Sequence, residues 1–366
     1  MRQLVAFTRK YHSKELKKII TIKDVARIAG VSTSTVSRVI RGESNVKKSS
    51  RSKIQKVIDE LGYRPNINAQ ALVSKKSSTL GVVIPNVSMP FFGTLAYGAE
   101  EAIKAGPYRV LVSNANDSER AEMDAIDSLL QHRCGAIIFH SAHTSDEKLI
   151  ELSERIPGLV FVNRFISKLA HRCVWLDNNQ GAQEATRHLM SKGHKDIAVI
   201  TRADVNPDAQ TRLDGIRTGM NNAGLTLDKD LLVQGTTADM DGGREAARKL
   251  LATGKKFTAI LVYNDNMAVG AVHELDAQGI KVPEQVSIIG FDDLLIAQAL
   301  LPELTTMHYP VKEMAEYASH LAIQLSEEPA SAGRTHLFMP HIVERNSVLD
   351  ISSEQTVLKA VSSEVS

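Results

Sequence analysis

One stretch near the start of the chain decides the fold of its first part: Thr21-Ile-Lys-Asp-Val-Ala-Arg-Ile-Ala-Gly30-Val-Ser-Thr-Ser-Thr-Val-Ser-Arg38-Val-Ile40. Thr21 can cap a first helix, and Asp24, three residues on, complements the free N–H groups and the dipole of that helix. Gly30 supplies a turn, and Ser32 is placed to cap a second helix. Two short helices joined in this way form either an ordinary surface hairpin or a DNA-binding helix-turn-helix.

The two expected helices separate apolar from polar residues. Helical periodicity places the apolar residues on the inner faces; they are Val25, Ile28, Ala29, Val36, Val39 and Ile40. Small, polar or cationic residues remain on the outer side of the second helix; they are Thr33, Ser34, Ser37 and Arg38. Such side chains suit a helix that lies in the major groove of DNA. The pattern therefore favours a helix-turn-helix over a surface hairpin.

The charge of the chain changes sign along its length. Residues 1–76 hold 18 Lys and Arg against 5 Asp and Glu, whereas residues 77–366 hold 26 against 37. The near-neutral total of +2 thus combines a cationic module of +13 with an anionic module of −11. This arrangement lets only the small N-terminal module approach phosphate groups.

Length and composition restrict the class of protein. A chain of 366 residues predicts two or three domains with a large core. We find no apolar run of membrane-spanning length and no signal peptide in the first twenty residues, so we expect a cytoplasmic protein without membrane contact. The two cysteines, Cys134 and Cys173, favour free thiols over a disulfide or a metal site.

A third helix and a linker follow the helix-turn-helix. Ile54, Val57, Ile58 and Leu61 recur at helical spacing, and Gly62 ends the helix. After the break at 63–66, residues 67–76 form a short, polar, helix-compatible segment that contains Leu72. A leucine in such a linker either packs internally or, if the linker lies on DNA, wedges between base steps of the minor groove.

From Thr79 onward, buried-type apolar runs alternate with helical patterns. The expected strands are Leu80–Ile84, Arg109–Ser113, Ala136–His140, Leu159–Asn163, Val174–Asp177, Ile197–Thr201, Ala259–Tyr263 and Val286–Phe291. The expected helices are Phe92–Lys104, Arg120–His132, Gln183–Lys192, Leu213–Ala223, Gly243–Leu251 and Met267–Gln278. This order is typical of doubly wound parallel sheets, and the number of strands indicates two similar α/β lobes.

The α/β region favours binding over catalysis. We find no dinucleotide or phosphate-loop glycine motif, no G-x-S-x-G and no H-E-x-x-H, so an enzyme is disfavoured and no cofactor or metal site is expected. Polar residues instead follow three strands, at Asn163-Arg164, Asn264-Asp265 and Asp292-Asp293. Ligands of open α/β sheets bind at that end of the strands. Each such residue is either a helix cap or part of a ligand-binding pocket, and their recurrence favours the pocket.

Several motifs in this order resemble the lactose/galactose repressor family of bacterial transcriptional regulators. They are Thr21–Ile40, Leu61-Gly-Tyr-Arg-Pro-Asn66, Ala69-Gln-Ala-Leu72, Thr79-Leu-Gly-Val-Val-Ile-Pro-Asn86, Gly193-His194, Arg212-Leu-Asp-Gly215, Tyr263-Asn-Asp-Asn-Met-Ala268 and Ile289-Gly-Phe-Asp-Asp293. The resemblance covers roughly residues 20–350. Within the family, Val162-Asn-Arg164, His171-Arg-Cys173 and Ala185-Thr-Arg187 look most like the galactose repressor and isorepressor group.

The resemblance implies an all-α helix-turn-helix headpiece plus a sensor domain of two doubly wound parallel-sheet lobes, like periplasmic binding proteins. It implies five segments: a basic N-terminal extension (1–20), the DNA-binding domain (21–64), a hinge-helix linker (65–78), a sugar-sensing and dimerisation domain (79–350) and a polar tail (351–366). The first lobe would combine about 79–175 with 310–338, and the second would combine 177–308 with the last strand.

On the DNA side, the resemblance implies a homodimer on a palindromic operator, with Leu72 as the minor-groove wedge. The implied DNA-binding residues are Thr33, Ser34, Thr35, Arg38, Asn45, Ser50, Arg51, Asn66, Ala69 and Leu72. Arg38 is the best candidate for a bidentate contact with guanine. The chain departs from the family at Lys47-Lys48, where a small capping residue is usual; the lysines would add phosphate affinity or weaken the start of the third helix.

On the sensor side, the resemblance implies a small sugar between the lobes. The implied effector-binding residues are Phe92, Asn163, Arg212, Asn264 and Asp292. Their carboxylate, amide and guanidinium groups suit hydroxyls, and Phe92 or Trp175 can cover the apolar face of a sugar ring. Arg212 in a surface ion pair and Trp175 in the core are the alternatives.

These features together predict a transcriptional repressor of genes for galactose or a related hexose, released from its operator by the sugar. The alternative is a regulator of the corepressor type, whose DNA binding is enhanced by another sugar, an amino sugar or a nucleobase. A sugar-transport receptor is disfavoured by the basic headpiece.

Overall fold

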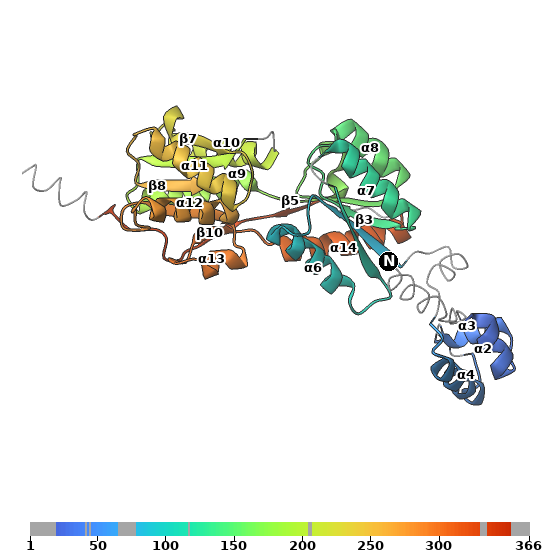
Figure 1. The fold of residues 1–366 in the computed structure, drawn as a ribbon. Coiled ribbons are helices and arrows are strands. Elements are labelled where there is room, and N and C mark those ends of the chain that lie inside the picture. The colour runs from blue at the N-terminus through green and yellow to red at the C-terminus, as the bar shows by residue number, and fades with distance from the viewer. Residues whose placement is uncertain are drawn as a thin grey trace, which may run out of the picture. The chain divides into compact units, whose positions relative to one another are not determined.

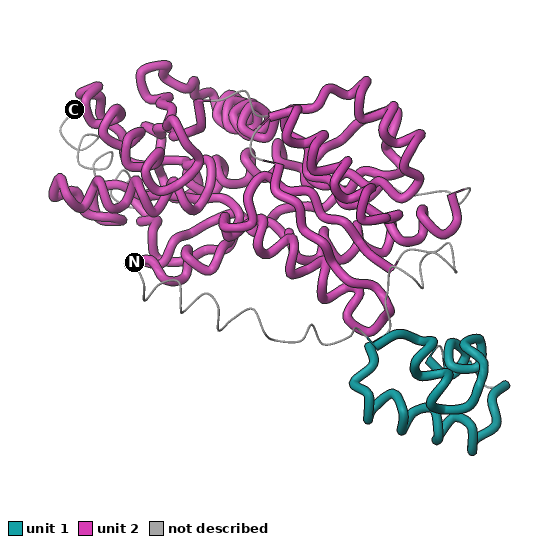
Figure 2. The backbone as a smooth tube through the Cα atoms, turned by 45° about the vertical axis from the view of Figure 1, so that its right-hand side comes forward, with its two compact units in different colours: residues 1–76 teal, residues 77–366 magenta. Residues whose placement is uncertain are grey.

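The computed structural model describes residues 20–40, 42–43, 45–64, 78–115, 118–203, 207–329 and 335–352. The chain forms two compact units, residues 1–76 and residues 77–366 (Figure 2). Within the described ranges, no helix is both long and apolar enough to cross a membrane.

The headpiece consists of three short helices around a small core. They are α2 (Ile22–Ala29), α3 (Thr33–Ile40) and α4 (Lys48–Leu61). Asp24 accepts hydrogen bonds from the N–H and the hydroxyl of Thr21, at 3.1 and 2.7 Å, so the expected start of α2 is confirmed. The Thr35 N–H donates to Ser32 Oγ at 3.2 Å, which confirms the start of α3.

The turns and the core of the headpiece follow from glycine and aliphatic residues. Gly30 and Gly62 end α2 and α4 with φ angles of 68° and 61°, a left-handed conformation that favours glycine. The buried core residues are Val25, Ala26, Ala29, Val36, Val39, Ile54, Val57 and Tyr63. The prediction that Ile28 faces inward is wrong: its side chain is 48% exposed, and the smaller Ala26 takes the inner position.

The first lobe of the second unit is a six-stranded sheet in the order β11-β5-β4-β3-β1-β2. Its strands are β1 (Thr79–Ile84), β2 (Arg109–Asn114), β3 (Ala136–Phe139), β4 (Gly158–Val162), β5 (Cys173–Leu176) and β11 (His336–Phe338). All neighbouring pairs are parallel. Its helices are α6 (Pro90–Ile103), α7 (Glu119–Gln131), α8 (Asp146–Arg155), the 3-10 helix η1 (Ser167–Arg172) and α14 (Val311–Glu327). Figure 1 shows α7 and α8 on one side of the sheet and α6 and α14 on the other.

The second lobe repeats this plan in the order β12-β10-β9-β8-β6-β7. Its strands are β6 (Ile197–Arg202), β7 (Leu232–Gly235), β8 (Ala259–Val262), β9 (Ser287–Asp292), β10 (Thr305–His308) and β12 (His341–Val343). Its helices are α9 (Asn178–Ser191), α10 (Pro207–Asn222), the 3-10 helix η2 (Lys229–Leu231), α11 (Met240–Ala252), α12 (Asp265–Ala277) and α13 (Leu295–Ala299). Only β12 runs antiparallel, against β10.

The chain crosses between the lobes, as the resemblance implied. It passes to the second lobe after β5, returns with α14 and β11, and crosses again to β12. Gly98 of α6 allows α14 to pack closely on this helix. A Cβ atom at this position would lie only 2.7 Å from the carbonyl oxygen of Lys312. The expected fold, a small all-α headpiece plus two doubly wound α/β lobes, is confirmed.

Candidate effector site and DNA-binding headpiece

The cleft between the two lobes contains a small inner chamber of about 60 Å³. All five predicted effector residues line it: Phe92, Asn163, Arg212, Asn264 and Asp292. They arrive from both lobes, because the carboxyl ends of β4, β8 and β9 and the helices α6 and α10 meet there. The five residues expected to bind the effector therefore lie together in one chamber.

Arg212 is the most deeply embedded cation of the chamber. It is 6% exposed, so the alternative of a surface ion pair is wrong. Its Nε donates to Asn178 Oδ1 at 2.8 Å, and its Nη1 donates to the carbonyl oxygen of Tyr263 at 2.6 Å. Its Nη2 lies 3.5 Å from Asp292 Oδ1, and the guanidinium carbon lies 3.6 Å from the centre of the Phe291 ring. The protein thus fixes the guanidinium from several sides.

Asp292 ends β9 in an unusual backbone conformation, with a φ of 112°. Such a conformation in a residue other than glycine marks a position where structure around it imposes strain. Burial raises the pKa of Asp292 to about 7, although the guanidinium of Arg212 acts in the opposite direction. This carboxyl therefore changes its charge near neutral pH.

Asn163 connects the two lobes. Its amide Nδ2 donates to Asp208 Oδ2, and its Oδ1 accepts a hydrogen bond from the Tyr309 hydroxyl. Asp208, at the start of α10 in the second lobe, also accepts a hydrogen bond from Asn178 Nδ2 at 3.2 Å. Asn163 has a φ of 60°, a conformation that asparagine tolerates better than most residues. Polar groups of the cleft thus satisfy one another across it.

Asn264 and Phe92 complete the predicted set. Asn264 accepts a hydrogen bond from the Met267 N–H at 2.9 Å and donates to the carbonyl oxygen of Ala238 at 3.0 Å, so it is both a helix cap and a wall of the chamber. The Phe92 ring meets the His140 ring edge-on, with their centres 4.9 Å apart. Phe92 therefore supplies an apolar wall, as expected.

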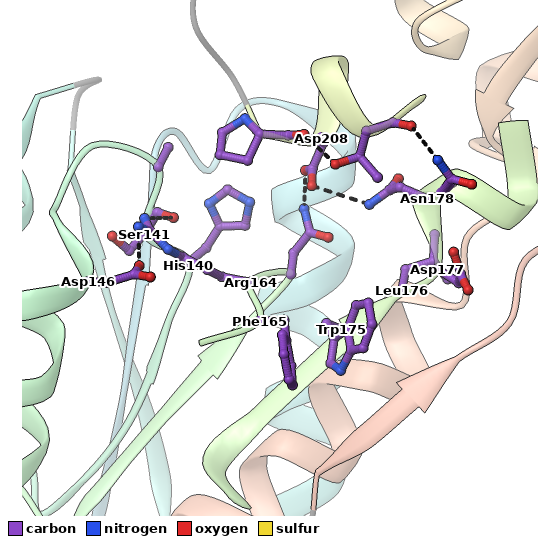
Figure 3. A pocket seen from close by; sticks show the side chains of 15 residues that line it. His140, Ser141, Asp146, Arg164, Phe165, Trp175, Leu176, Asp177, Asn178 and Asp208 are labelled. Atoms are coloured by element: carbon purple, nitrogen blue, oxygen red, sulfur yellow. Dashed lines mark hydrogen bonds and ion pairs between the residues drawn. The ribbon is translucent and has the colours of Figure 1, made fainter. Parts of the chain in front are cut away.

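Figure 3 shows the side chains that line a second, outer chamber of about 410 Å³. His140, Asn163 and Asp208 line both chambers, so these residues form the wall between them. Trp175 lies in the outer chamber, half-buried, with its ring 4.8 Å from that of Phe165. Trp175 is thus neither a fully buried core residue nor a cover of the inner chamber.

Sequence reasoning missed several residues of the cleft. His140, Asn178, Asp208 and Tyr309 are examples, because none of them stood among the residues expected to bind the effector. It also missed Glu122, which is 2% exposed and accepts hydrogen bonds from the N–H groups of 142–144 and from the hydroxyls of Ser141 and Thr144. Glu122 thereby fixes the loop after β3 against the outer chamber.

In the headpiece, the candidate DNA-binding residues differ in exposure. Thr33, Ser34, Arg38 and Asn45 are exposed, whereas Thr35, Ser50 and Arg51 are half-buried. The hydroxyl oxygens of Thr35 and Ser32 lie 2.8 Å apart in a hydrogen bond, and the Arg51 guanidinium donates to the carbonyl oxygen of Glu43. The remaining candidates, Asn66, Ala69 and Leu72, lie outside the described residues.

Lys47 stands at the N-cap of α4 without a side-chain cap hydrogen bond. The first-turn N–H groups of α4 therefore lack the partner that a serine, threonine, asparagine or aspartate would offer. Elsewhere, among the residues that the structure describes, His, Cys, Asp and Glu do not gather into a cluster fit for a metal ion.

Two family models match the chain. Residues 21–66 match the bacterial regulatory proteins of the lacI family, and residues 77–340 match the periplasmic binding proteins and sugar-binding domain of that family. The chain belongs to the LacI family of bacterial regulatory proteins. It is therefore a DNA-binding transcriptional regulator with a sugar-binding type of sensor domain.

Relatives within the LacI family match almost the whole chain. The regulator GalR of Salmonella typhimurium strain LT2 is 41% identical over 328 residues, which cover 90% of this chain and 96% of GalR. GalS of the same strain is 41% identical over 330 residues, and GalR of Escherichia coli is 39% identical over 334, covering 90% and 91% of this chain and 97% of each relative.

Solved structures of LacI-family proteins show the same architecture. The lac repressor dimer bound to operator and an anti-inducer superposes with a TM-score of 0.81 at 26% identity, covering 91% of this chain and all of that chain. A complex of the regulator CelR with cellobiose gives a TM-score of 0.66 at 25% identity, covering 90% and 99%.

Proposed function

We propose that this regulator represses genes for the metabolism or transport of galactose or a related hexose, and that the sugar releases it from its operator. The inner chamber carries this proposal, because it combines a carboxylate, two amides, a guanidinium and an aromatic ring between two lobes. The likeness to GalR and GalS supports the choice of sugar.

The sugar would act by exchanging hydrogen bonds. In this structure, Asn163 connects the lobes through its hydrogen bonds with Asp208 and Tyr309. A hexose between the lobes would replace these bonds with bonds to its hydroxyls, while Arg212 and Asp292 hold adjacent hydroxyls and Phe92 covers a C–H face. The lobes would then take a different separation, and the headpieces of a dimer would lose their spacing on DNA.

On the DNA side, we assign base contacts to Thr33, Ser34 and Arg38 of α3, and we keep Thr35 of the same helix as a further DNA-binding candidate. We assign contacts with the DNA backbone to Asn45, Ser50 and Arg51. The linker residues Asn66, Ala69 and Leu72 would lie in the minor groove. The exposure of Thr33, Ser34 and Arg38 supports this assignment. The segments 1–20, 21–64, 65–78, 79–350 and 351–366 remain our proposed domain boundaries, and DNA binding without catalysis in the cytoplasm remains our expectation.

We propose a homodimer as the DNA-binding form. The structure of the lac repressor dimer on its operator supports this, and so do two exposed leucines. Leu295 begins α13 and Leu301 lies two residues beyond its end, and they are 79% and 86% exposed. In analytical ultracentrifugation, a Leu301→Glu variant should sediment as a monomer at concentrations where the parent protein sediments as a dimer. The variant should also lose operator affinity. Leu337→Glu, at a 40% exposed leucine of the other lobe, is the control; equal behaviour of both variants would refute this interface.

The sign of the response separates the proposed function from its alternative. A palindromic operator candidate from upstream of the gene itself or of neighbouring sugar genes is titrated with the protein at fixed salt, and D-galactose is then added. We expect release, with an affinity loss of about 5- to 150-fold. Tightening of the complex by a sugar would establish a corepressor instead, and indifference to D-galactose and other hexoses would overturn the effector assignment while leaving DNA binding intact.

A further inference from the structure

The two chambers of the cleft differ sharply in size. The inner chamber, which holds the predicted effector residues, measures about 60 Å³, and the outer chamber measures about 410 Å³. Small-molecule sites usually have about 300–1,000 Å³, so only the outer chamber lies in that range. A ligand ring that contacts Asn163 and Asp292 must therefore replace the hydrogen bond between Asn163 and Asp208 in the wall, and the outer chamber then becomes continuous with its binding site.

Two buried polar groups at the outer chamber lack partners. Among the described residues, no hydrogen-bond partner meets His140 Nδ1 or Trp175 Nε1. His140 is 8% exposed and lines both chambers, and Figure 3 shows its imidazole directed toward Asp208 at the wall. Burial lowers the pKa of His140, so the ring is neutral at pH 7 and can accept or donate a hydrogen bond. Unpaired buried polar atoms are costly, and a ligand hydroxyl would satisfy them.

The outer chamber also has the surface that a sugar ring requires. The Phe165 and Trp175 rings lie at 37° to each other with their centres 4.8 Å apart, and Phe165, which lines the chamber, remains 46% exposed. The polar side chains of Arg164 and Asp177 lie beside this aromatic wall. Aromatic faces contact the C–H groups of a pyranose, and polar groups around them bind its hydroxyls.

We propose that the outer chamber is a subsite for a second sugar ring, so that the preferred effectors are galactosides with two rings. The first ring lies at the wall, where Asn163, Arg212 and Asp292 bind it. The second ring stacks on Phe165 and bonds to His140 and Trp175. This inference rests on the proposed sugar-responsive function and adds the size of the effector to it.

The test compares the affinities of a one-ring sugar, D-galactose, and of two-ring sugars, melibiose and lactose. They are measured by isothermal titration calorimetry of the full-length protein. We expect at least one disaccharide to bind about tenfold more tightly than D-galactose, since the second ring buries apolar surface on Phe165. Phe165→Ala should abolish this advantage and leave the affinity for D-galactose within about twofold. Tyr97→Ala, which removes an aromatic ring of similar exposure (51%) that lines neither chamber, is the matched control.

A conservative variant tests the unpaired N–H group. Trp175→Phe keeps an aromatic ring but removes Nε1, and should weaken disaccharide binding about three- to tenfold, the value of one hydrogen bond, without changing D-galactose binding. Binding of D-galactose without any gain for either disaccharide would overturn the second subsite alone. An equal loss for one and two rings in Phe165→Ala would also overturn it. Absence of binding by all three sugars would refute both the subsite and the galactose-type function.

Discussion

Two arginines show how differently the headpiece and the sensor use polar side chains. Arg38 of α3 is exposed, and its guanidinium makes no ion pair with another described residue. Arg212 of α10 is 6% exposed and already bonded to Asn178, to Tyr263 and, as an ion pair, to Asp292. The headpiece therefore presents its groups to an external partner, whereas the sensor uses its groups internally until a ligand replaces some of the bonds.

This difference has consequences for how each region responds to change. A substitution of Arg38 should alter DNA binding with little effect on folding, because this side chain forms no ion pair within the described part of the chain that the substitution would break. A substitution in the cleft should alter folding and binding together, because it leaves buried groups without partners. Four variants test this contrast, beginning with the largest expected effect.

Arg212→Ala should have the largest effect. At a pH above the raised pKa of Asp292, where this carboxylate is ionised, the variant leaves it buried without its cation, and breaking a buried ion pair costs about 3–5 kcal/mol of unfolding free energy. Thermal or urea unfolding should show this loss. D-galactose should fail to release the variant from the operator, even at a hundredfold higher concentration than releases the parent protein. Arg217→Ala on the same helix is the control, because Arg217 pairs with Asp214 at the surface (47% exposed) and contributes at most about 1 kcal/mol. Similar losses in both variants would contradict the buried role of Arg212.

Asp292 should make stability depend on pH. Burial raises its pKa from 3.8 to about 7, so between these values the folded protein binds a proton that the unfolded chain does not. Stability from this group is therefore present at pH 4 and decreases as the pH rises to 7, by roughly 4 kcal/mol. Urea unfolding across this range should show the decrease, and Asp292→Asn should reduce it. Buried Asp265, whose pKa is also raised, contributes a slope of the same sign that the variant retains. An unchanged slope in Asp292→Asn would exclude Asp292 as its source.

Periodicity and end positions explain what the sequence could predict of this fold. Buried aliphatic runs such as Leu80–Ile84 gave strands because parallel sheets are covered on both faces. Edge strand β7 (Leu232–Gly235) and strand β10 (Thr305–His308) were missed, because β7 is half-exposed and β10 contains threonines and a histidine. Ile28 shows a further limit: periodicity assigns a face, but the packing of three helices decides which residue fills it.

The same distinction applies to the site. Asn163, Asn264 and Asp292 could be predicted because each follows a strand, and ends of parallel strands meet at one edge. His140 also ends a strand, but a single histidine beside the apolar run Ala136–Phe139 carries no signal of its own. The bond between Asn163 and Asp208 joins residues 45 positions apart on different lobes. Only the relative placement of the lobes reveals it, so the division of the cleft into two chambers was beyond sequence reasoning.

Arg38→Ala tests the exposed side of the comparison. Loss of a bidentate guanine contact should weaken operator binding by about 1–3 kcal/mol and reduce the preference for one base pair, while sugar affinity and unfolding remain unchanged. Arg27→Ala is the control: its exposed guanidinium lies on α2, with Asp24 at 3.4 Å. That variant should weaken binding to all DNA sequences equally, if at all. Loss of stability in Arg38→Ala would show that the residue has an internal role.

Lys47→Ser should give the smallest effect and the most informative sign. Lys47 caps α4 without a side-chain hydrogen bond, and serine can accept one from a first-turn N–H, which stabilises a helix by about 0.5–1 kcal/mol. Slower amide hydrogen exchange in α4 of the full-length protein would report this gain.

If Lys47 contacts phosphate, the same variant should reduce the slope of log affinity against log salt by about 0.9. A more stable α4 with a smaller salt slope would mean that this headpiece has given up folding free energy for an external partner, as the exposed Arg38 suggests. A more stable α4 with an unchanged slope would mean that Lys47 makes no such contact and that the contrast between the two regions rests on α3 alone.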